Sequence, residues 1–230
     1  MFITFEGGEG SGKSTQARRL AEHLRGLGRT VVETREPGGS PFAERLRTLL
    51  LDPEIEKHTA KSEALLFYAA RADHLEQVIR PALKRGDIVV CDRFSDSTRA
   101  YQGYGGTLDL KWLEALELLV VVPTTPDLTI IVDVPAEVGL ARAMLRRQAE
   151  APPRQPGQKP EPKAPRSLLS DRFEARDLSY HKRLREGFLE IAKREPRRCT
   201  VIDGNGPLDA VADRIWRAVE QRLTSAQMAR

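Results

Sequence analysis

Apolar and polar positions along this chain follow two rhythms, which predict strands and helices in turn. Five short apolar runs have the length of buried strands, at residues 2–5, 29–34, 87–92, 127–133 and 199–203. Segments with helical spacing follow them, at about residues 13–27, 42–51, 60–84, 112–121, 136–147, 171–193 and 208–223. Because strands and helices alternate, the pattern predicts an α/β fold, with a five-stranded parallel sheet, right-handed crossovers and helices on both faces.

The longest helical pattern, residues 60–84, has two faces of different character. Its apolar positions predict a buried stripe made of Leu65, Tyr68, Ala72, Leu75 and Ile79. Phe67, Arg71 and His74 share a second face about 100° away. Phe67 and Arg71 could form a wall on which a flat base stacks, although such residues are more often a core ring and a surface ion pair. His74 is expected to be solvated or hydrogen-bonded within the fold.

The composition changes abruptly at residues 151–165, which are rich in proline. Such a segment cannot bury much apolar surface and is expected to be mobile and extended. Asp171 and Glu174 then have the spacing of a capping box and are expected to begin a helix that runs to about Lys193. We expect one domain over residues 1–230, with a lid at about 143–172 that contains this insertion.

Bulk composition narrows the class of protein without naming a function. The 230 residues are 40% hydrophobic, enough for a core, and the net charge of +4 fits an anionic ligand. Aromatic residues are only 6%, and basic residues cluster only within 142–185, which argues against a nucleic-acid partner. Cys91 and Cys199 lie in apolar runs, so we expect buried thiols in a reducing compartment. The sequence shows no secretory leader and no long apolar run, so we expect a cytoplasmic protein that is not inserted in a membrane.

A glycine-rich loop between the first strand and the first helix carries the clearest chemical signal. The pattern Gly7-x-x-x-x-Gly12-Lys13-Ser14, in this strand–loop–helix context, is typical of a phosphate site that binds ATP. Its glycines allow main-chain amides to converge on an anion at the helix N-terminus. Lys13 would reach the β- and γ-phosphates, and Ser14 would ligate Mg²⁺. The residues expected to contact ATP in this loop are Gly7, Gly8, Glu9, Gly10, Ser11, Gly12, Lys13, Ser14 and Thr15.

Charged pairs follow the second and third predicted strands. Arg35 and Glu36 precede a Pro-Gly-Gly turn, and Asp92 and Arg93 end the third strand. Since open α/β sheets bind ligands at the carboxyl ends of their strands, these pairs are candidate ligand contacts. Asp92 is a candidate Mg²⁺ ligand, directly or through water, and Arg93 presents a fork to phosphate. The first pair could also be an ordinary charged turn, and the hydroxyls after Arg93 could merely cap a helix.

With these residues in view, the whole chain resembles the thymidylate kinase family of nucleoside monophosphate kinases. The signatures occur in the family's order: Phe5-Glu-Gly-Gly-Glu-Gly-Ser-Gly-Lys-Ser-Thr-Gln16, Thr34-Arg-Glu-Pro-Gly-Gly39, Phe67-Tyr-Ala-Ala-Arg71, Asp92-Arg93-Phe94, Ser97-Thr-Arg-Ala-Tyr-Gln-Gly103 and Asp171-Arg-Phe-Glu174. The resemblance implies a three-layer P-loop kinase fold, a homodimer, and an enzyme of dTTP biosynthesis that phosphorylates dTMP with ATP and Mg²⁺.

The resemblance also implies roles for individual residues of the dTMP site. Glu9 would contact the deoxyribose 3′-hydroxyl, while Tyr101 would crowd the 2′ position. The phosphate would be held or bordered by Arg35, Arg47 and Arg93. Phe67 would stack on thymine and Arg71 would donate to its O4, with Thr98 and Gln102 reading the base edge. Glu36 and Ser97 belong to the same motifs and are also expected at this site.

The family implies that the lid supplies an arginine that closes over the ATP phosphates. The candidates are Arg142, Arg146, Arg147, Arg154, Arg166 and Arg172. Arg147 and Arg172 are favoured as catalytic residues, and Arg142 as an ATP contact. The Pro-rich insertion departs from the family's usual short lid and obscures the register.

The chemistry fits a phosphate acceptor. A phosphate monoester is largely dianionic at neutral pH and needs no general base, so Lys13, Arg93 and Mg²⁺ would mainly absorb charge. Two alternatives stay open. One is a deoxynucleoside kinase with Glu36 as the base, and the other is a non-catalytic nucleotide-binding module or nucleic-acid-binding ATPase.

Overall fold

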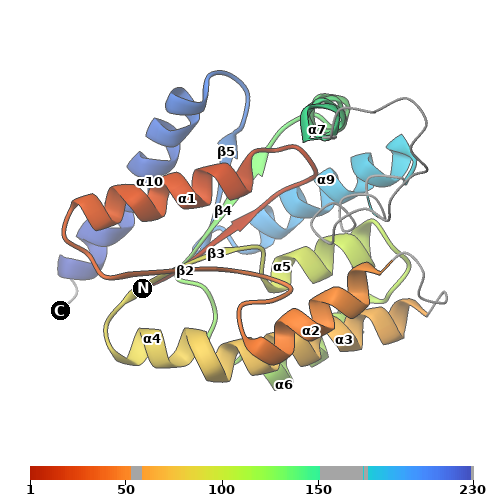
Figure 1. Cartoon of the computed structure of the whole chain (residues 1–230), viewed down its shortest axis with the longest axis horizontal. Helices are drawn as coiled ribbons and strands as arrows, with labels where there is room; N and C mark the ends of the chain where they lie inside the picture. The colour runs from red at the N-terminus through yellow and green to blue at the C-terminus, as the bar shows by residue number, and fades with distance from the viewer. Residues whose placement is uncertain (53–58, 151–172, 174–175, 229–230) are drawn as a thin grey trace, which may run out of the picture.

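A parallel sheet forms the middle layer of the molecule (Figure 1). The computed structural model of the chain describes residues 1–52, 59–150, 173 and 176–228. Its strands are β1 (Phe2–Glu6), β2 (Val31–Arg35), β3 (Ile88–Asp92), β4 (Leu128–Asp133) and β5 (Cys199–Asp203). They pair in parallel in the order β2-β3-β1-β4-β5, which confirms the predicted sheet.

Helices cover both faces of this sheet, which confirms the three-layer fold (Figure 1). On one face lie α1 (Lys13–Gly26) and α10 (Leu208–Met228). The other face carries α2 (Pro41–Leu51), α3 (Ala60–His74), α4 (Arg80–Lys84) and α6 (Leu110–Val120). Successive β1 residues serve opposite layers, since Ile3 packs with α1 and α10 while Phe2 packs with α3 and α6. On the same face as α3 and α6, α9 (Leu178–Arg194) packs on β4 and β5, and α7 (Ala136–Glu150) packs against α9.

The predicted helix over residues 60–84 is confirmed, although its winding changes in the middle. A π-helical segment, Leu75–Ile79, separates α3 from α4. The predicted apolar stripe was wrong at Leu65, which is 49% exposed, whereas Glu63, Arg71 and His74 on α3 are buried. These polar side chains find partners inside the fold, so an apolar count along the helix does not identify its buried face.

The start of one further helix differs from the sequence-based expectation. Helix α9 begins at Leu178, and the Asp177 carboxylate caps it by accepting a hydrogen bond from Tyr180 N at 2.7 Å. The prediction of a continuous helix from residue 171 was therefore wrong, and Asp171, Glu174 and the Pro-rich residues 151–165 lie outside the described residues. The polar stretch after Arg93 forms α5 (Ser95–Thr98) and a π-helical segment, Arg99–Tyr104.

No helix in the described part of the chain is both long enough and apolar enough to cross a membrane.

Candidate active site

The glycine loop connects the buried strand β1 to the N-terminus of α1. Gly10 has φ +63°, and a Cβ there would overlap the carbonyl oxygen of Gly139 on α7. Gly7 has φ +139°, and a Cβ there would lie 2.5 Å from the Val132 carbonyl oxygen of β4. The loop therefore needs glycine at both positions to fit against β4 and α7, with its amides at the positive end of α1.

Lys13 folds back over this loop. Its Nζ donates to the Gly8 carbonyl oxygen at 3.2 Å, and the side chain is buried. Burial lowers the pKa of Lys13, and so does the nearby Arg93, while Glu9 and Asp92 oppose the shift. By contrast, Ser14 and Thr15 are exposed in the first turn of α1, so their hydroxyls face solvent beside the loop.

The end of β3 places Asp92 and Arg93 beside the loop. In the sheet register Asp92 pairs with Phe5 of β1 on one side and Arg35 of β2 on the other. Asp92 Oδ1 is buried and accepts no hydrogen bond in the described structure. Arg93 has φ +69°, an uncommon conformation for a residue with a side chain and one that carries strain. Such strain is frequent at ligand sites.

Arg93, Glu9 and Tyr101 form a compact cluster over the loop. Arg93 Nη2 and the Tyr101 hydroxyl both donate to Glu9 Oε1, at 3.0 and 2.6 Å. Burial raises the pKa of Glu9, but Arg93, Lys13 and Tyr101 outweigh burial and lower it to about 2. The Arg93 guanidinium also lies 4.8 Å from the Tyr101 ring centroid. In this arrangement Glu9 is the anionic partner of the Arg93 guanidinium, and a bound phosphate could take the place of Glu9.

Glu6 anchors the next helix to the sheet, a role that was not expected from the sequence. Glu6 Oε1 accepts from Phe94 N at 2.8 Å and from Ser97 N at 3.2 Å. Oε2 is hydrogen-bonded to Ser97 Oγ at 2.5 Å. Burial and the neighbouring Asp96 raise the pKa of Glu6 to about 8. An acidic residue at the end of the predicted buried strand was the available signal for this role.

A second cluster lies across the sheet edge, where Arg71 is almost fully buried. Arg71 Nε donates to Glu36 Oε2 at 2.7 Å. Its Nη2 donates at 3.1 Å to the Phe94 carbonyl oxygen and at 3.1 Å to Thr98 Oγ1. Arg71 Nη1 is buried and has no hydrogen-bond partner among the described residues. The pair of Glu36 and Arg71 is thus buried, so Arg71 does not form a surface ion pair and Glu36 does not lie in an exposed turn. Phe67, on the same helix as Arg71, is half-buried.

Other predicted site residues are already engaged in the structure. Arg35 pairs with Glu44 at 3.1 Å on the surface, and Arg47 Nη1 donates to the Pro37 carbonyl oxygen at 2.6 Å. Burial and the nearby Arg35 lower the pKa of Arg47 to about 10. Gln102 Nε2 donates to Glu63 Oε1 at 2.9 Å. The predicted phosphate and base contacts therefore lie near the carboxyl ends of β2 and β3, held by acidic and carbonyl oxygens.

The arginines of the predicted lid are only partly described. Arg142 Nη1 donates at 3.1 Å to the carbonyl oxygen of Gly204, just after β5. Arg146 is exposed and Arg147 is half-buried near the end of α7. Arg154, Arg166 and Arg172 lie outside the described residues.

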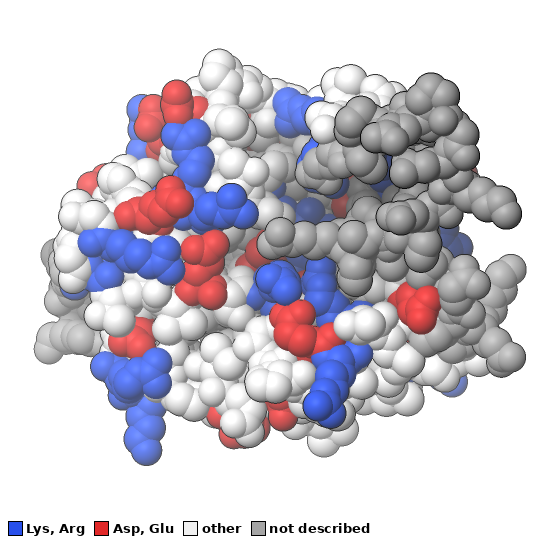
Figure 2. All heavy atoms as spheres, in the orientation of Figure 1, with Lys and Arg blue, Asp and Glu red and all other residues white. Residues whose placement is uncertain are grey.

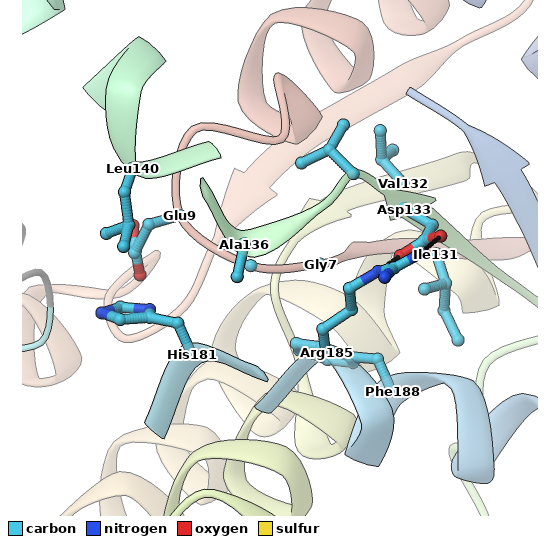
Figure 3. A pocket seen from close by; sticks show the side chains of 12 residues that line it. Gly7, Glu9, Ile131, Val132, Asp133, Ala136, Leu140, His181, Arg185 and Phe188 are labelled. Atoms are coloured by element: carbon cyan, nitrogen blue, oxygen red, sulfur yellow. Dashed lines mark hydrogen bonds and ion pairs between the residues drawn. The ribbon is translucent and has the colours of Figure 1, made fainter. Parts of the chain in front are cut away.

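Helix α9 closes the other side of the loop, and the sequence did not indicate this contribution to the site. Figure 3 shows Glu9 facing His181, and Arg185 directed at Asp133 at the end of β4. Arg185 makes two hydrogen bonds to this carboxylate, at 2.7 and 2.8 Å. The pocket that these residues line is thus built from the glycine loop, the end of β4, the start of α7 and α9. Spacing in the sequence gave no signal for this convergence.

A glycine loop at a helix N-terminus, a lysine folded over it and an Asp-Arg pair at the end of the adjacent strand define a P-loop phosphotransferase. The thymidylate kinase family model matches residues 5–215 of this chain. The thymidylate kinase of Caulobacter vibrioides is 52% identical over 96% of this chain and 97% of its own length. That of Afipia carboxidovorans is 49% identical over 100% of this chain and 92% of its own length. A crystal structure of thymidylate kinase from Ehrlichia chaffeensis is 35% identical, has a TM-score of 0.72 and covers 96% of this chain and 98% of that chain. The chain belongs to the thymidylate kinase family.

Proposed function

We infer that this chain phosphorylates dTMP to dTDP, with ATP as the phosphoryl donor, in the synthesis of dTTP. The family match over residues 5–215 and the relatives of about half-identical sequence over nearly the full length support this activity. The structural observation that supports the acceptor most directly is the buried Arg71 Nη1, a charged donor without a protein partner in the described structure. An oxygen on a flat base is the kind of partner that would satisfy it.

On the donor side, the loop from Gly7 to Thr15 would hold the ATP phosphates. Lys13 would leave the Gly8 carbonyl oxygen for the β- and γ-phosphates, because an anion competes for an ammonium better than a neutral oxygen does. Arg142, between α7 and the turn after β5, would border the nucleotide. Arg147 or Arg172 would complete the phosphate contacts from the lid, at a cost on the order of 10³ in rate if lost.

The residues beside the loop fit a bound Mg²⁺. Asp92 Oδ1 is buried without a hydrogen-bond donor in the described structure, and the Ser14 hydroxyl is exposed at the loop. Both supply oxygen ligands, the kind that Mg²⁺ prefers, directly or through water. When bound, the ion would neutralise charge on the β- and γ-phosphates.

On the acceptor side, Arg93, Arg47 and Arg35 would surround the dTMP phosphate. Phe67 would stack on thymine, and Arg71 would donate to its C4 oxygen. The remaining contacts to base and sugar would come from Glu9, Ser97, Thr98, Tyr101 and Gln102. Because the acceptor phosphate is already ionised, these residues need only position it and absorb charge.

The environment of Glu36 argues against the alternative function, a deoxynucleoside kinase that would use Glu36 as its base. Both Glu36 oxygens are occupied, one by Arg71 Nε at 2.7 Å and one by His74 Nδ1 at 3.0 Å. A carboxylate that is buried and held by two donors is poorly suited to take a proton from a sugar hydroxyl. This favours a phosphate acceptor over a nucleoside.

A homodimer and a cytoplasmic location are part of the same proposal. Side chains of Leu118 and Leu119 on α6, with Leu65 on α3, present an exposed apolar surface that a second copy could cover. The two cysteines are free and buried, as expected in a reducing compartment. On the face in Figure 2, acidic and basic residues of the described chain are interspersed, which does not favour a nucleic-acid backbone there.

The activity is tested by offering every nucleoside monophosphate, and thymidine, to the purified full chain with ATP and Mg²⁺. We expect dTMP to be the preferred acceptor. Phosphorylation of thymidine alone would refute the proposal, and ATP hydrolysis without any acceptor product would favour a nucleotide-binding module. Light scattering tests the dimer: Leu119→Glu should yield monomers, whereas Leu27→Glu, at an exposed leucine at the end of α1, should not. A monomeric unmodified chain would contradict the dimer.

A further inference from the structure

His74 is a fully buried histidine that links the turn after β2 to helix α3. Its Nδ1 lies 3.0 Å from Glu36 Oε1, and its Nε2 lies 2.7 Å from Thr34 Oγ1. The other Glu36 oxygen accepts from Arg71 Nε at 2.7 Å. Thr34, His74, Glu36 and Arg71 therefore form one continuous hydrogen-bonded chain. An ionised carboxylate only accepts hydrogen bonds, so His74 Nδ1 is the donor to Glu36.

This chain fixes the plane of the Arg71 guanidinium. Glu36 holds Nε, while the Phe94 carbonyl oxygen and Thr98 Oγ1 hold Nη2. The Tyr68 and Phe94 ring centroids lie 4.7 and 5.3 Å from the guanidinium carbon. Because a guanidinium is planar, fixing two of its nitrogens also fixes the direction of the third, Nη1.

Gly39 shows independently that the fold is shaped around the imidazole. It has φ +90°, and a Cβ at this position would overlap the His74 ring and lie 2.6 Å from Thr34 Oγ1. The second glycine of the Pro-Gly-Gly turn thus leaves the space that the histidine occupies. The turn after β2 and the histidine on α3 depend on one another.

We propose that His74 is a positioning residue that sets the base selectivity of the acceptor site by holding Glu36, which in turn orients Arg71. This inference rests on the proposed placement of the dTMP base at Arg71. Nη1 would donate to the C4 oxygen of thymine, whereas cytosine presents an amino donor at C4. A fixed donor rejects another donor because both groups would be left unpaired, and a donor free to rotate rejects it less.

Steady-state kinetics with dTMP and dCMP test this role. His74→Ala should raise KM for dTMP about tenfold, leave kcat within about twofold, and narrow the dTMP-to-dCMP ratio of kcat/KM by about tenfold. His74→Asn should restore most of the ratio, because its amide nitrogen occupies the position of Nδ1. His74→Gln, whose nitrogen corresponds to Nε2, should not.

Asp73→Asn is the matched control. Asp73 accepts from Ser40 Oγ and so joins the same two segments of the chain one residue away, without touching the Glu36–Arg71 pair. It should leave the ratio unchanged. A loss of selectivity in Asp73→Asn equal to that in His74→Ala would mean that general loosening is responsible and would overturn the proposal.

A double-mutant cycle with Arg71→Gln separates this inference from the proposed site. If Arg71→Gln leaves selectivity intact, the base does not lie at Arg71 and the proposed site itself fails. If Arg71→Gln removes selectivity, His74→Ala should add nothing further in that background, because it acts through Arg71. Additive effects would overturn the role of His74. Should His74→Ala fail to fold, equal ratios in the Asn and Gln variants would overturn it as well.

Discussion

Replacing the buried Glu6 by glutamine should stabilise the protein, and increasingly so as the pH rises. Glu6 is fully buried at the end of β1, where burial and Asp96 raise its pKa while Ser97, Arg93 and Phe94 N oppose the shift. Glutamine keeps the shape of the protonated acid. Its oxygen can accept from Phe94 N and Ser97 N, and its amide can donate to Ser97 Oγ, so the contacts of α5 would survive.

The sign and size follow from the difference between folded and unfolded pKa. The pKa of Glu6 rises from 4.5 to about 8, so the folded protein holds a proton that the unfolded chain releases between these values. The stabilisation that comes from this proton on Glu6 is fully present below pH 4.5 and is lost as the pH rises toward about 8. At one pKa unit per 1.36 kcal/mol, the loss is about 5 kcal/mol at most at the upper end.

Urea unfolding of both proteins from about pH 5 to about pH 8 measures this difference. The free energy of unfolding of Glu6→Gln should exceed that of the unmodified chain by a margin that widens with pH, by about 1.4 kcal/mol per unit at most. Glu22→Gln, at an exposed position on α1, is the matched control and should give a flat difference. A margin for Glu6→Gln that stays constant with pH, or a variant that is less stable at the highest pH, would contradict the raised pKa of Glu6.

Three other perturbations test the loop and its neighbours. Lys13→Ala should reduce phosphoryl transfer on the order of 10³-fold or more without changing the melting temperature, and near-normal turnover would contradict its role. Gly10→Ala places a Cβ against the Gly139 carbonyl oxygen, so calorimetry should show weaker ATP binding, and unchanged affinity would contradict the loop geometry. Glu9 has a pKa lowered from 4.5 to about 2, so its stabilisation is present above pH 4.5 and is lost as the pH falls. Glu9→Gln should therefore lower the free energy of unfolding by about 3 kcal/mol at most at neutral pH, and a gap that does not shrink in acid would contradict this.

Local sequence rules determined the strands, most helices and the glycine loop. Strand runs such as Phe2-Ile3-Thr4-Phe5 and the Gly-rich turn after them are dictated by neighbours in the chain, through burial periodicity and backbone freedom. Asp92 and Arg93 could also be placed at the ligand edge in advance, because the carboxyl ends of parallel strands share one edge.

Which charges are buried, and which partners they meet, depends on how the elements pack in three dimensions. Glu36 and Arg71 pair across the sheet edge, and the apolar stripe on α3 was misjudged because Arg71 and His74 find buried partners there while Leu65 is exposed in the single chain. Likewise, β1 lies between β3 and β4, so Asp133, and with it Arg185 from α9, meets the loop. Such pairings depend on strand order and packing, and no spacing along the chain contains that information.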